Sequence, residues 1–270
     1  MNKKRLLGIA LSVFLTLGVV GCSSKESKET VNDKKTIVVG ATPVPAGEIL
    51  KVAQPLLEKK GYKLEIKEFT DYVTPNTALN DGEIDANFFQ HTPYLDNFNS
   101  EKKTELEAVK KIYISPLALY SNKTKKLEEL KNGATIAVPN DPTNETRALR
   151  LLEKSGLIKL KKGDTLTKGD IAENKKNIKI EEIDAPQLPR ILNDVDAAVI
   201  NTNYAIEAKL NPLKDSILIE DKDSPYANVI AVRKGDKDKA HIKALSEVLT
   251  SKEVKDFINE KYKGVVIPTF

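Results

Sequence analysis

The sequence predicts an α/β fold in which strands and helices alternate around a mainly parallel sheet. Short runs of β-branched residues, such as 36–40 and 135–139, are each followed by a segment with the apolar spacing of an amphipathic helix. This alternation is typical of parallel strands joined by crossover helices. The 270 residues suffice for one large domain or for two lobes of roughly a hundred residues each.

The expected elements follow from local patterns taken in chain order. We expect strands at 36–40, 62–69, 85–89, 135–139, 177–183, 196–200 and 228–233. We expect helices at 48–60, 75–80, from Thr92 onward, and at 143–155, 186–193, 240–250 and 251–262. Glycines at 61 and 156 are typical of helix C-termini.

Three segments carry a more specific expectation. Pro55 lies inside the first helix and predicts a kink or a break there, because proline lacks the backbone donor that a helix uses. Thr92 and Pro93 are expected to be the N-cap and the first residue of their helix. Residues 159–176, rich in Lys, Gly and Asp, are expected to form a surface loop.

The N-terminus has the organisation of a signal peptide that ends at a cysteine. Residues 3–5 are basic, residues 6–20 are nearly all apolar, and a small residue precedes Cys22, the only cysteine in the chain. The apolar stretch is short for a membrane span. We therefore expect a lipoprotein signal peptide at 1–21, a lipid on Cys22 and a flexible tether at 22–35. The alternative is an ordinary secretory signal with a chance cysteine.

The charge of the chain gives no support for nucleic-acid binding. Removing residues 1–21 takes away three positive charges and no negative one, so the formal net charge falls from +4 to +1. The remaining charges are mixed in sign, which is typical of a solvated surface. The expected location is the extracytoplasmic face of the cell membrane, held there by lipid.

A ligand cleft is expected beyond the carboxyl ends of the strands, where open α/β sheets bind ligands. The segments in question are 41–43, 70–72, 90–94, 140–147 and 201–204, and they combine aromatic and amide side chains. The sequence has no glycine-rich phosphate loop, nucleophile elbow or zinc-ligand motif. We expect no cofactor and no metal, although the many Asp and Glu residues leave paired carboxylates open.

Arg147 is the most informative single residue in these segments. It lies in the first turns of a helix, where free amides, the helix dipole and a guanidinium could together bind a carboxylate. The alternative is a surface arginine paired with Glu145 or Glu153. Asn144, three positions earlier, could equally cap the helix.

The other cleft candidates also have plainer interpretations. His91 could be a hydrogen-bonded loop histidine. Tyr94 and Phe98 could belong to the core. Phe88 and Phe89 should point to opposite faces of their strand, so at most one of them can face the cleft.

Long stretches of the chain resemble the NlpA/MetQ family, the methionine-binding lipoproteins of ABC importers. The matching stretches are FTDYVTPNTAL at 69–79, DANFFQHTPYL at 85–95, AVPNDPTNETRA at 137–148, DAAVIN at 196–201, DSPYAN at 223–228 and GVVIPTF at 264–270. The resemblance covers nearly all of the chain after the tether.

The resemblance implies a type II periplasmic-binding-protein fold, two α/β lobes with a ligand cleft at the hinge. Lobe 1 would comprise residues 36–118 with a return segment at 227–270, and lobe 2 residues 119–226. The implied partners are methionine or a related amino acid, an ABC permease with its ATPase, and the membrane through the lipid anchor. The protein is expected to be a monomer.

The resemblance also implies roles for the cleft residues. Arg147 would bind the substrate carboxylate with Asn144 beside it, and Asn201 and Asn228 would hold the amino and carboxylate groups. The side-chain pocket would be walled by Tyr72, Phe89, His91 and Tyr94. Aromatic walls suit a thioether, which makes favourable sulfur–ring contacts.

The sequence departs from the family pattern at two places that bear on the ligand. Val44 and Ala46 stand where members often have Gly and His, and Thr146 stands where Gly is common. Some relatives bind dipeptides or other amino acids, so a receptor for such a ligand is one alternative. An enzyme, either a hydrolase or a lyase, on the same scaffold is another. The sequence offers no positive sign of an adhesin.

Overall fold

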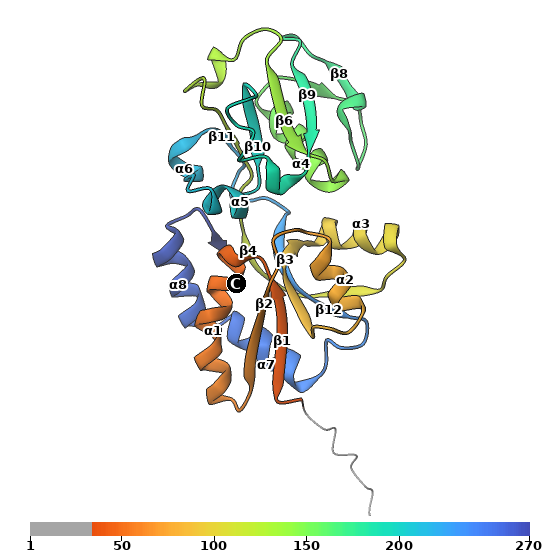
Figure 1. Cartoon of the computed structure of the whole chain (residues 1–270), viewed down its shortest axis with the longest axis vertical. Coiled ribbons are helices and arrows are strands. Elements are labelled where there is room, and N and C mark those ends of the chain that lie inside the picture. Colours follow the sequence, from red (N-terminus) through yellow and green to blue (C-terminus); the bar gives the residue numbers. More distant parts are fainter. Residues whose placement is uncertain (1–33) are drawn as a thin grey trace, which may run out of the picture. The chain divides into compact units, whose positions relative to one another are not determined.

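The computed structural model describes residues 34–270, and these form two α/β lobes, each with its own sheet (Figure 1). The predicted signal peptide 1–21, Cys22 and the tether up to residue 33 lie outside the described residues. Lys34, at the end of the predicted tether, places its Nζ 2.7 Å from Asp85 Oδ1. The positions immediately before the first strand are thus already in contact with the fold.

The first sheet contains six strands in the order β13-β4-β12-β3-β1-β2. Its strands are β1 (Thr36–Ala41), β2 (Lys63–Glu68), β3 (Ala86–His91), β4 (Leu106–Ile114), β12 (Ala227–Arg233) and β13 (Ile267–Pro268). β1 pairs in parallel with β2 and β3, whereas β12 is antiparallel to both β3 and β4. The sheet is therefore mixed, with a parallel half formed by the strands of the first 91 residues.

Helices cover both faces of this sheet (Figure 1). One face carries α1 (Glu48–Lys59), α7 (Ala240–Leu249) and α8 (Lys252–Tyr262), and the other carries α2 (Thr74–Asn80) and α3 (Thr92–Lys102). α1 buries Ile49, Leu50 and Leu57, which recur at the spacing of one helix face. α1 is one helix through Pro55, so of the kink or break expected there, the break is absent.

The second sheet contains five strands in the order β11-β5-β10-β6-β9. Its strands are β5 (Ala118–Tyr120), β6 (Thr135–Pro139), β9 (Lys179–Ile183), β10 (Ala197–Ile200) and β11 (Ser216–Ile219). Its helices are α4 (Pro142–Lys154), α5 (Thr202–Glu207) and α6 (Pro212–Asp215). β6 is parallel to β9 and β10, and β5 is antiparallel to its neighbours.

Two local expectations for this part of the chain are wrong. Residues 159–176 are not only a loop, because β7 (Lys159–Leu160) and β8 (Ile171–Glu173) pair within them. Residues 186–193 form no α-helix: a single 3-10 turn at Ala185–Gln187 is followed by further turns. Leu188 and Leu192 are buried there, so burial rather than helical hydrogen bonding explains the apolar pattern.

The chain passes between the sheets twice, from β4 to β5 and from β11 to β12. These two crossing segments, residues 115–117 and 220–226, are hydrogen-bonded to each other, since Glu220 N donates to Leu117 O at 2.8 Å. The two passages between the sheets also explain why the first sheet contains antiparallel strands. β4 leaves the first sheet in the direction of β3, and β12 returns in the opposite direction. The expectation of mainly parallel sheets missed this return.

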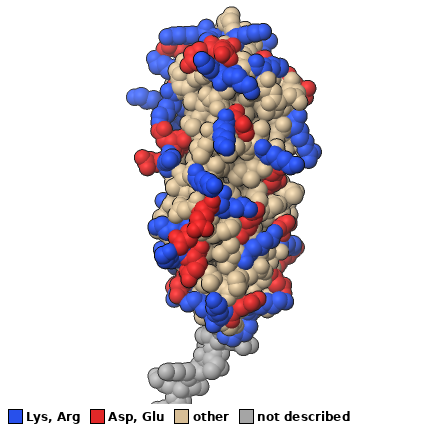
Figure 2. Space-filling model, turned by 90° about the vertical axis from the view of Figure 1, so that its left-hand side faces the viewer, with Lys and Arg blue, Asp and Glu red and all other residues tan. Residues whose placement is uncertain are grey.

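The described surface carries charges of both signs. Figure 2 shows Lys and Arg interspersed with Asp and Glu over the face that it presents. Among residues 34–270, no helix combines the length and the apolar character that crossing a bilayer requires.

Candidate functional site

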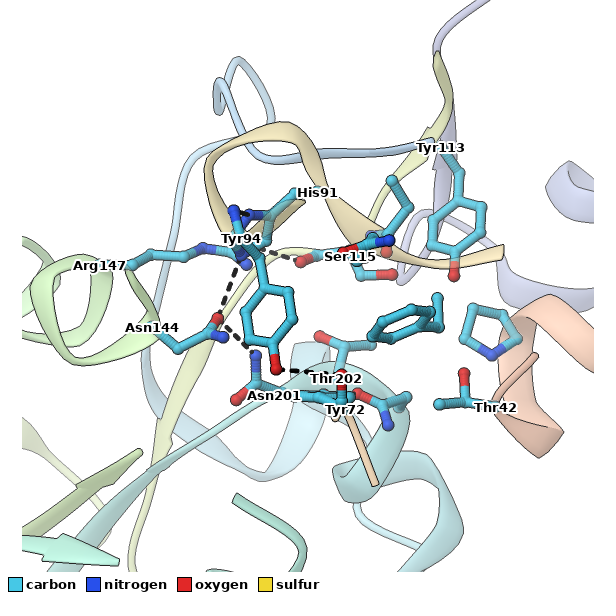
Figure 3. A pocket seen from close by; sticks show the side chains of 15 residues that line it. Thr42, Tyr72, His91, Tyr94, Tyr113, Ser115, Asn144, Arg147, Asn201 and Thr202 are labelled. Atoms are coloured by element: carbon cyan, nitrogen blue, oxygen red, sulfur yellow. Dashed lines mark hydrogen bonds between the residues drawn. The ribbon is translucent and has the colours of Figure 1, made fainter. Parts of the chain in front are cut away.

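The structure brings all eight predicted cleft residues around one cavity (Figure 3). They are Tyr72, Phe89, His91, Tyr94, Asn144, Arg147, Asn201 and Asn228. The cavity contains about 440 Å³ of atom-free space, part of it open to solvent.

Three aromatic rings form one wall of the cavity. The Tyr72 ring centroid lies 5.8 Å from that of Phe89 and 5.9 Å from that of Tyr94, and Phe89 and Tyr94 are 6.0 Å apart. Phe88 instead packs on Tyr113 in the core at 5.3 Å. The strand alternation therefore correctly predicts that only one of the two phenylalanines faces the cavity.

Arg147 projects from α4 with only 4% of its side chain exposed, so it is not a surface arginine. Its Nε donates to Glu220 Oε1 at 3.0 Å and its Nη2 donates to Ser115 O at 2.9 Å and to Glu220 Oε2. The ring of Tyr226 lies 4.6 Å from its Cζ. Neither partner suggested by the sequence contacts it. The guanidinium instead ties together the two crossing segments.

The predicted alternative partners of Arg147 are engaged elsewhere. Glu145 Oε1 accepts from Lys168 N at 2.9 Å, and Glu153 Oε1 accepts from Leu160 N at 2.7 Å. Both carboxylates therefore stabilise the chain around β7 and β8.

Asn144 bridges the two lobes and does not cap its helix. The N-cap is Asp141, whose Oδ1 accepts from Asn144 N at 2.9 Å. Asn144 Oδ1 accepts from Asn201 Nδ2 at 2.9 Å and lies 3.3 Å from His91 Nε2 (Figure 3). The side-chain oxygen of Asn144 thus contacts His91 on β3 and Asn201 at the end of β10.

His91 caps helix α3, a role that the sequence suggested for Thr92. Its Nδ1 accepts from Tyr94 N at 3.1 Å, which leaves the proton on Nε2, facing Asn144. Burial, followed by the nearby Arg147 charge, lowers the pKa of His91 to about 3. The imidazole is therefore neutral around pH 7 in the folded chain.

Acid should therefore destabilise the fold through His91. Unfolded, this residue takes up a proton below about pH 6.5, whereas the folded chain resists protonation down to about pH 3. Its contribution is complete above the unfolded pKa and is lost as the pH falls, by about 2 kcal/mol at about pH 5. Urea unfolding of the wild type and of His91→Gln should show this slope in the wild type alone. Parallel pH profiles for the two proteins would refute it.

Three buried polar atoms around the cavity have no partner within the described residues. They are Asn201 Oδ1, Asn203 Nδ2 and Ser115 Oγ, all on side chains that line it. Buried polar atoms are nearly always hydrogen-bonded in native proteins. An acceptor and a donor left over at one site are suited to a ligand that carries both a donor and an acceptor.

Sequence reasoning missed seven other residues that line the cavity. They are Thr42, Pro45, Gln90, Tyr113, Ser115, Thr202 and Asn203. Thr42, Gln90, Thr202 and Asn203 lie in the segments 41–43, 90–94 and 201–204, where the ends of the predicted strands suggest a cleft. Tyr113 lies at the end of β4 and Ser115 lies on the first crossing segment. No local sequence pattern predicts that these positions reach the cavity.

Of the residues that depart from the family pattern, Thr146 and Ala46 lie differently with respect to the cavity. Thr146 points away from the cavity, since its Oγ1 donates to Pro142 O at 2.7 Å and accepts from Leu166 N at 2.8 Å. Ala46 is fully buried next to the lining residue Pro45.

The described part of the site contains neither a metal-binding cluster nor a thiol or carboxylate. No group of three His, Cys, Asp or Glu side chains that could hold a metal ion occurs in residues 34–270. The described lining contains no thiol and no carboxylate. Its chemistry is that of hydrogen bonding, one guanidinium and aromatic surface.

Comparison with known proteins places these features in a family. A family model described as NlpA lipoprotein matches residues 37–270. The D-methionine-binding lipoprotein MetQ of Salmonella typhi is 47% identical, covering 92% of each chain, and the methionine-binding lipoprotein MetQ of Bacillus subtilis is 46% identical, covering 98% of each. A nutrient binding protein from Burkholderia cenocepacia, solved bound to methionine, is 50% identical with a TM-score of 0.85, covering 87% of this chain and 100% of that one.

Proposed function

The chain belongs to the NlpA lipoprotein family, and on that premise we propose that it captures methionine for an ABC importer. It would be held on the extracytoplasmic face of the cell membrane by lipid on Cys22, work as a monomer and deliver methionine to a permease with its ATPase. The family is one of binding proteins, and we propose binding without catalysis for this chain as well.

The observation that carries the proposal is the pairing of unsatisfied polar atoms with an aromatic wall in one cavity. Arg147, Asn203 Nδ2 and Ser115 Oγ can serve a carboxylate, and Asn201 Oδ1 can accept from an ammonium. The rings of Tyr72, Phe89 and Tyr94 offer surface for an apolar side chain. A thioether suits such rings, because sulfur–aromatic contacts are worth about 0.3–1.5 kcal/mol each.

The proposed lobes give this site a way to enclose its ligand. With lobe 1 at 36–118 and 227–270 and lobe 2 at 119–226, the ligand lies between them and the crossing segments act as the hinge. Closure would bury the methionine, and the permease would recognise the closed form. Asn144, which contacts both His91 and Asn201, would join the two halves in that form.

L-Methionine should raise the melting temperature of the purified protein. A ligand that binds only the folded chain stabilises it by about 2.7 kcal/mol at a hundredfold excess over Kd, which is about 5–10 °C for a chain of this size. L-Glutamate and L-lysine should do much less, since their charged ends would meet aromatic walls. A screen in which either of them gives the largest shift would overturn the assignment.

The same preparation separates a receptor from an enzyme. Incubated with L-methionine or with a methionine-containing dipeptide, a receptor returns the compound unchanged, whereas a hydrolase or lyase yields product. The described lining offers no carboxylate for acid–base catalysis, which supports the receptor. A larger shift with the dipeptide than with L-methionine would identify a peptide receptor.

A further inference from the structure

The guanidinium that faces the cavity already has a carboxylate partner. Glu220 accepts from Arg147 Nε at 3.0 Å and also from its Nη2, so the two side chains form a two-point ion pair. Glu220 is itself held in place, because its Oε2 accepts from Leu117 N at 3.1 Å and its own N–H donates to Leu117 O at 2.8 Å. The carboxylate is therefore a fixed part of the site, although it does not line the cavity.

The charges around the cavity consequently do not favour an anion. Arg147 is the one charged side chain among the described lining residues, since His91 is neutral, and Glu220 compensates it. A further carboxyl group near the cavity is that of Asp141, which accepts from the lining residue Asn144 through its Nδ2 at 2.9 Å. A bare carboxylate would bring an unbalanced negative charge into a largely buried site.

We propose that Glu220 makes the site select a zwitterion: with Arg147 compensated, the ligand must carry its own ammonium to be accepted. This proposal rests on the proposed function and adds a specificity-determining residue to it. A zwitterion adds no net charge, and its ammonium can donate to the unpaired Asn201 Oδ1. The same molecule without the ammonium leaves that oxygen unsatisfied and adds a negative charge near Glu220.

Two ligands that differ only in the ammonium test the proposal. L-Methionine and 4-(methylsulfanyl)butanoate share the carboxylate and the thioether, and each is titrated calorimetrically into the full-length protein in detergent. The wild type should bind L-methionine and bind the anion far more weakly. In Glu220→Gln, affinity for the anion should rise about ten-fold or more, because Arg147 regains an uncompensated charge, while affinity for L-methionine changes by less than about three-fold.

Further variants distinguish an effect of the negative charge of Glu220 from an effect of Glu220 on the position of Arg147. Asp221→Asn removes a neighbouring carboxylate that is 64% exposed and pairs with Lys154, so it should leave both affinities unchanged. Glu220→Ala removes the charge together with the hydrogen bonds, and the ratio of the two affinities should still shift toward the anion. This ratio is informative even if the alanine variant is less stable.

The outcomes are distinct. If Glu220 only positions Arg147, both ligands carry the affected carboxylate and both lose affinity in parallel, which would overturn the proposal. An unchanged ratio in both variants would do the same. Failure of the wild type to bind L-methionine at all would remove the proposed function, and this inference with it, before any variant is compared.

Discussion

Replacing Arg147 with alanine should weaken the binding of L-methionine by about thirty-fold to several thousand-fold, or roughly 2–5 kcal/mol. The side chain is 4% exposed and is the one charged group among the described lining residues, so its loss leaves the ligand carboxylate buried without a cation. Isothermal titration measures the effect directly. Arg147→Lys should recover only part, because an ammonium is a point charge and cannot reproduce the planar, two-point contact of the guanidinium with Glu220.

The same variant should also destabilise the ligand-free chain, which the sequence alone does not suggest. If Arg147 bound only the ligand carboxylate, the stability of the ligand-free chain would not depend on it. In the structure, its removal deprives Glu220, only 15% exposed, of its charged donor and deprives Ser115 O of a hydrogen bond. We expect a loss of about 1–3 kcal/mol in urea unfolding without ligand.

Arg150→Ala is the matched control for both measurements. Arg150 lies one turn further along α4, is exposed and donates to Gly163 O at 2.8 Å. Its replacement should leave the affinity unchanged and alter stability by at most about 1 kcal/mol. Intact binding in Arg147→Ala would eliminate the carboxylate assignment.

Cys22→Ser should abolish acylation and leave the protein either unprocessed, with its apolar signal segment still attached, or shed from the membrane. A serine hydroxyl cannot take the place of the thiol that lipoproteins acylate, and stable anchoring depends on the attached chains, since each buried CH₂ contributes about 0.8 kcal/mol. Detergent-phase partitioning and the mass of the mature chain report the result. Ser23→Ala, one residue away, should partition like the wild type. A Cys22→Ser protein that is still cleaved and still enters the detergent phase would refute the lipid anchor.

The sequence predicts those site residues whose position follows from a local pattern, namely the residues at the ends of strands. Strands and their ends can be recognised locally, and ligands of open α/β sheets lie beyond the carboxyl ends. The predicted ends of β3, β6 and β10 therefore point to His91, Asn144 and Asn201, which all line one cavity in the structure.

The rest depends on contacts between distant parts of the chain. Glu220 lies 73 residues from Arg147, and nothing near it in the sequence indicates which arginine it would meet. Ser115 likewise acquires its position from the crossing of β4 into the second lobe. Thr92 is the cap that the sequence predicts for α3, and Asn144 is one candidate for α4, because both residue types are good caps, yet His91 and Asp141 accept the bonds.

A crystal structure of the protein with L-methionine is the most direct test of the account. It should show the carboxylate on Arg147, the ammonium within hydrogen-bond distance of Asn201 Oδ1 and the thioether among Tyr72, Phe89 and Tyr94, with the Arg147–Glu220 pair intact. Methionine bound elsewhere, or bound with its carboxylate away from Arg147, would contradict it.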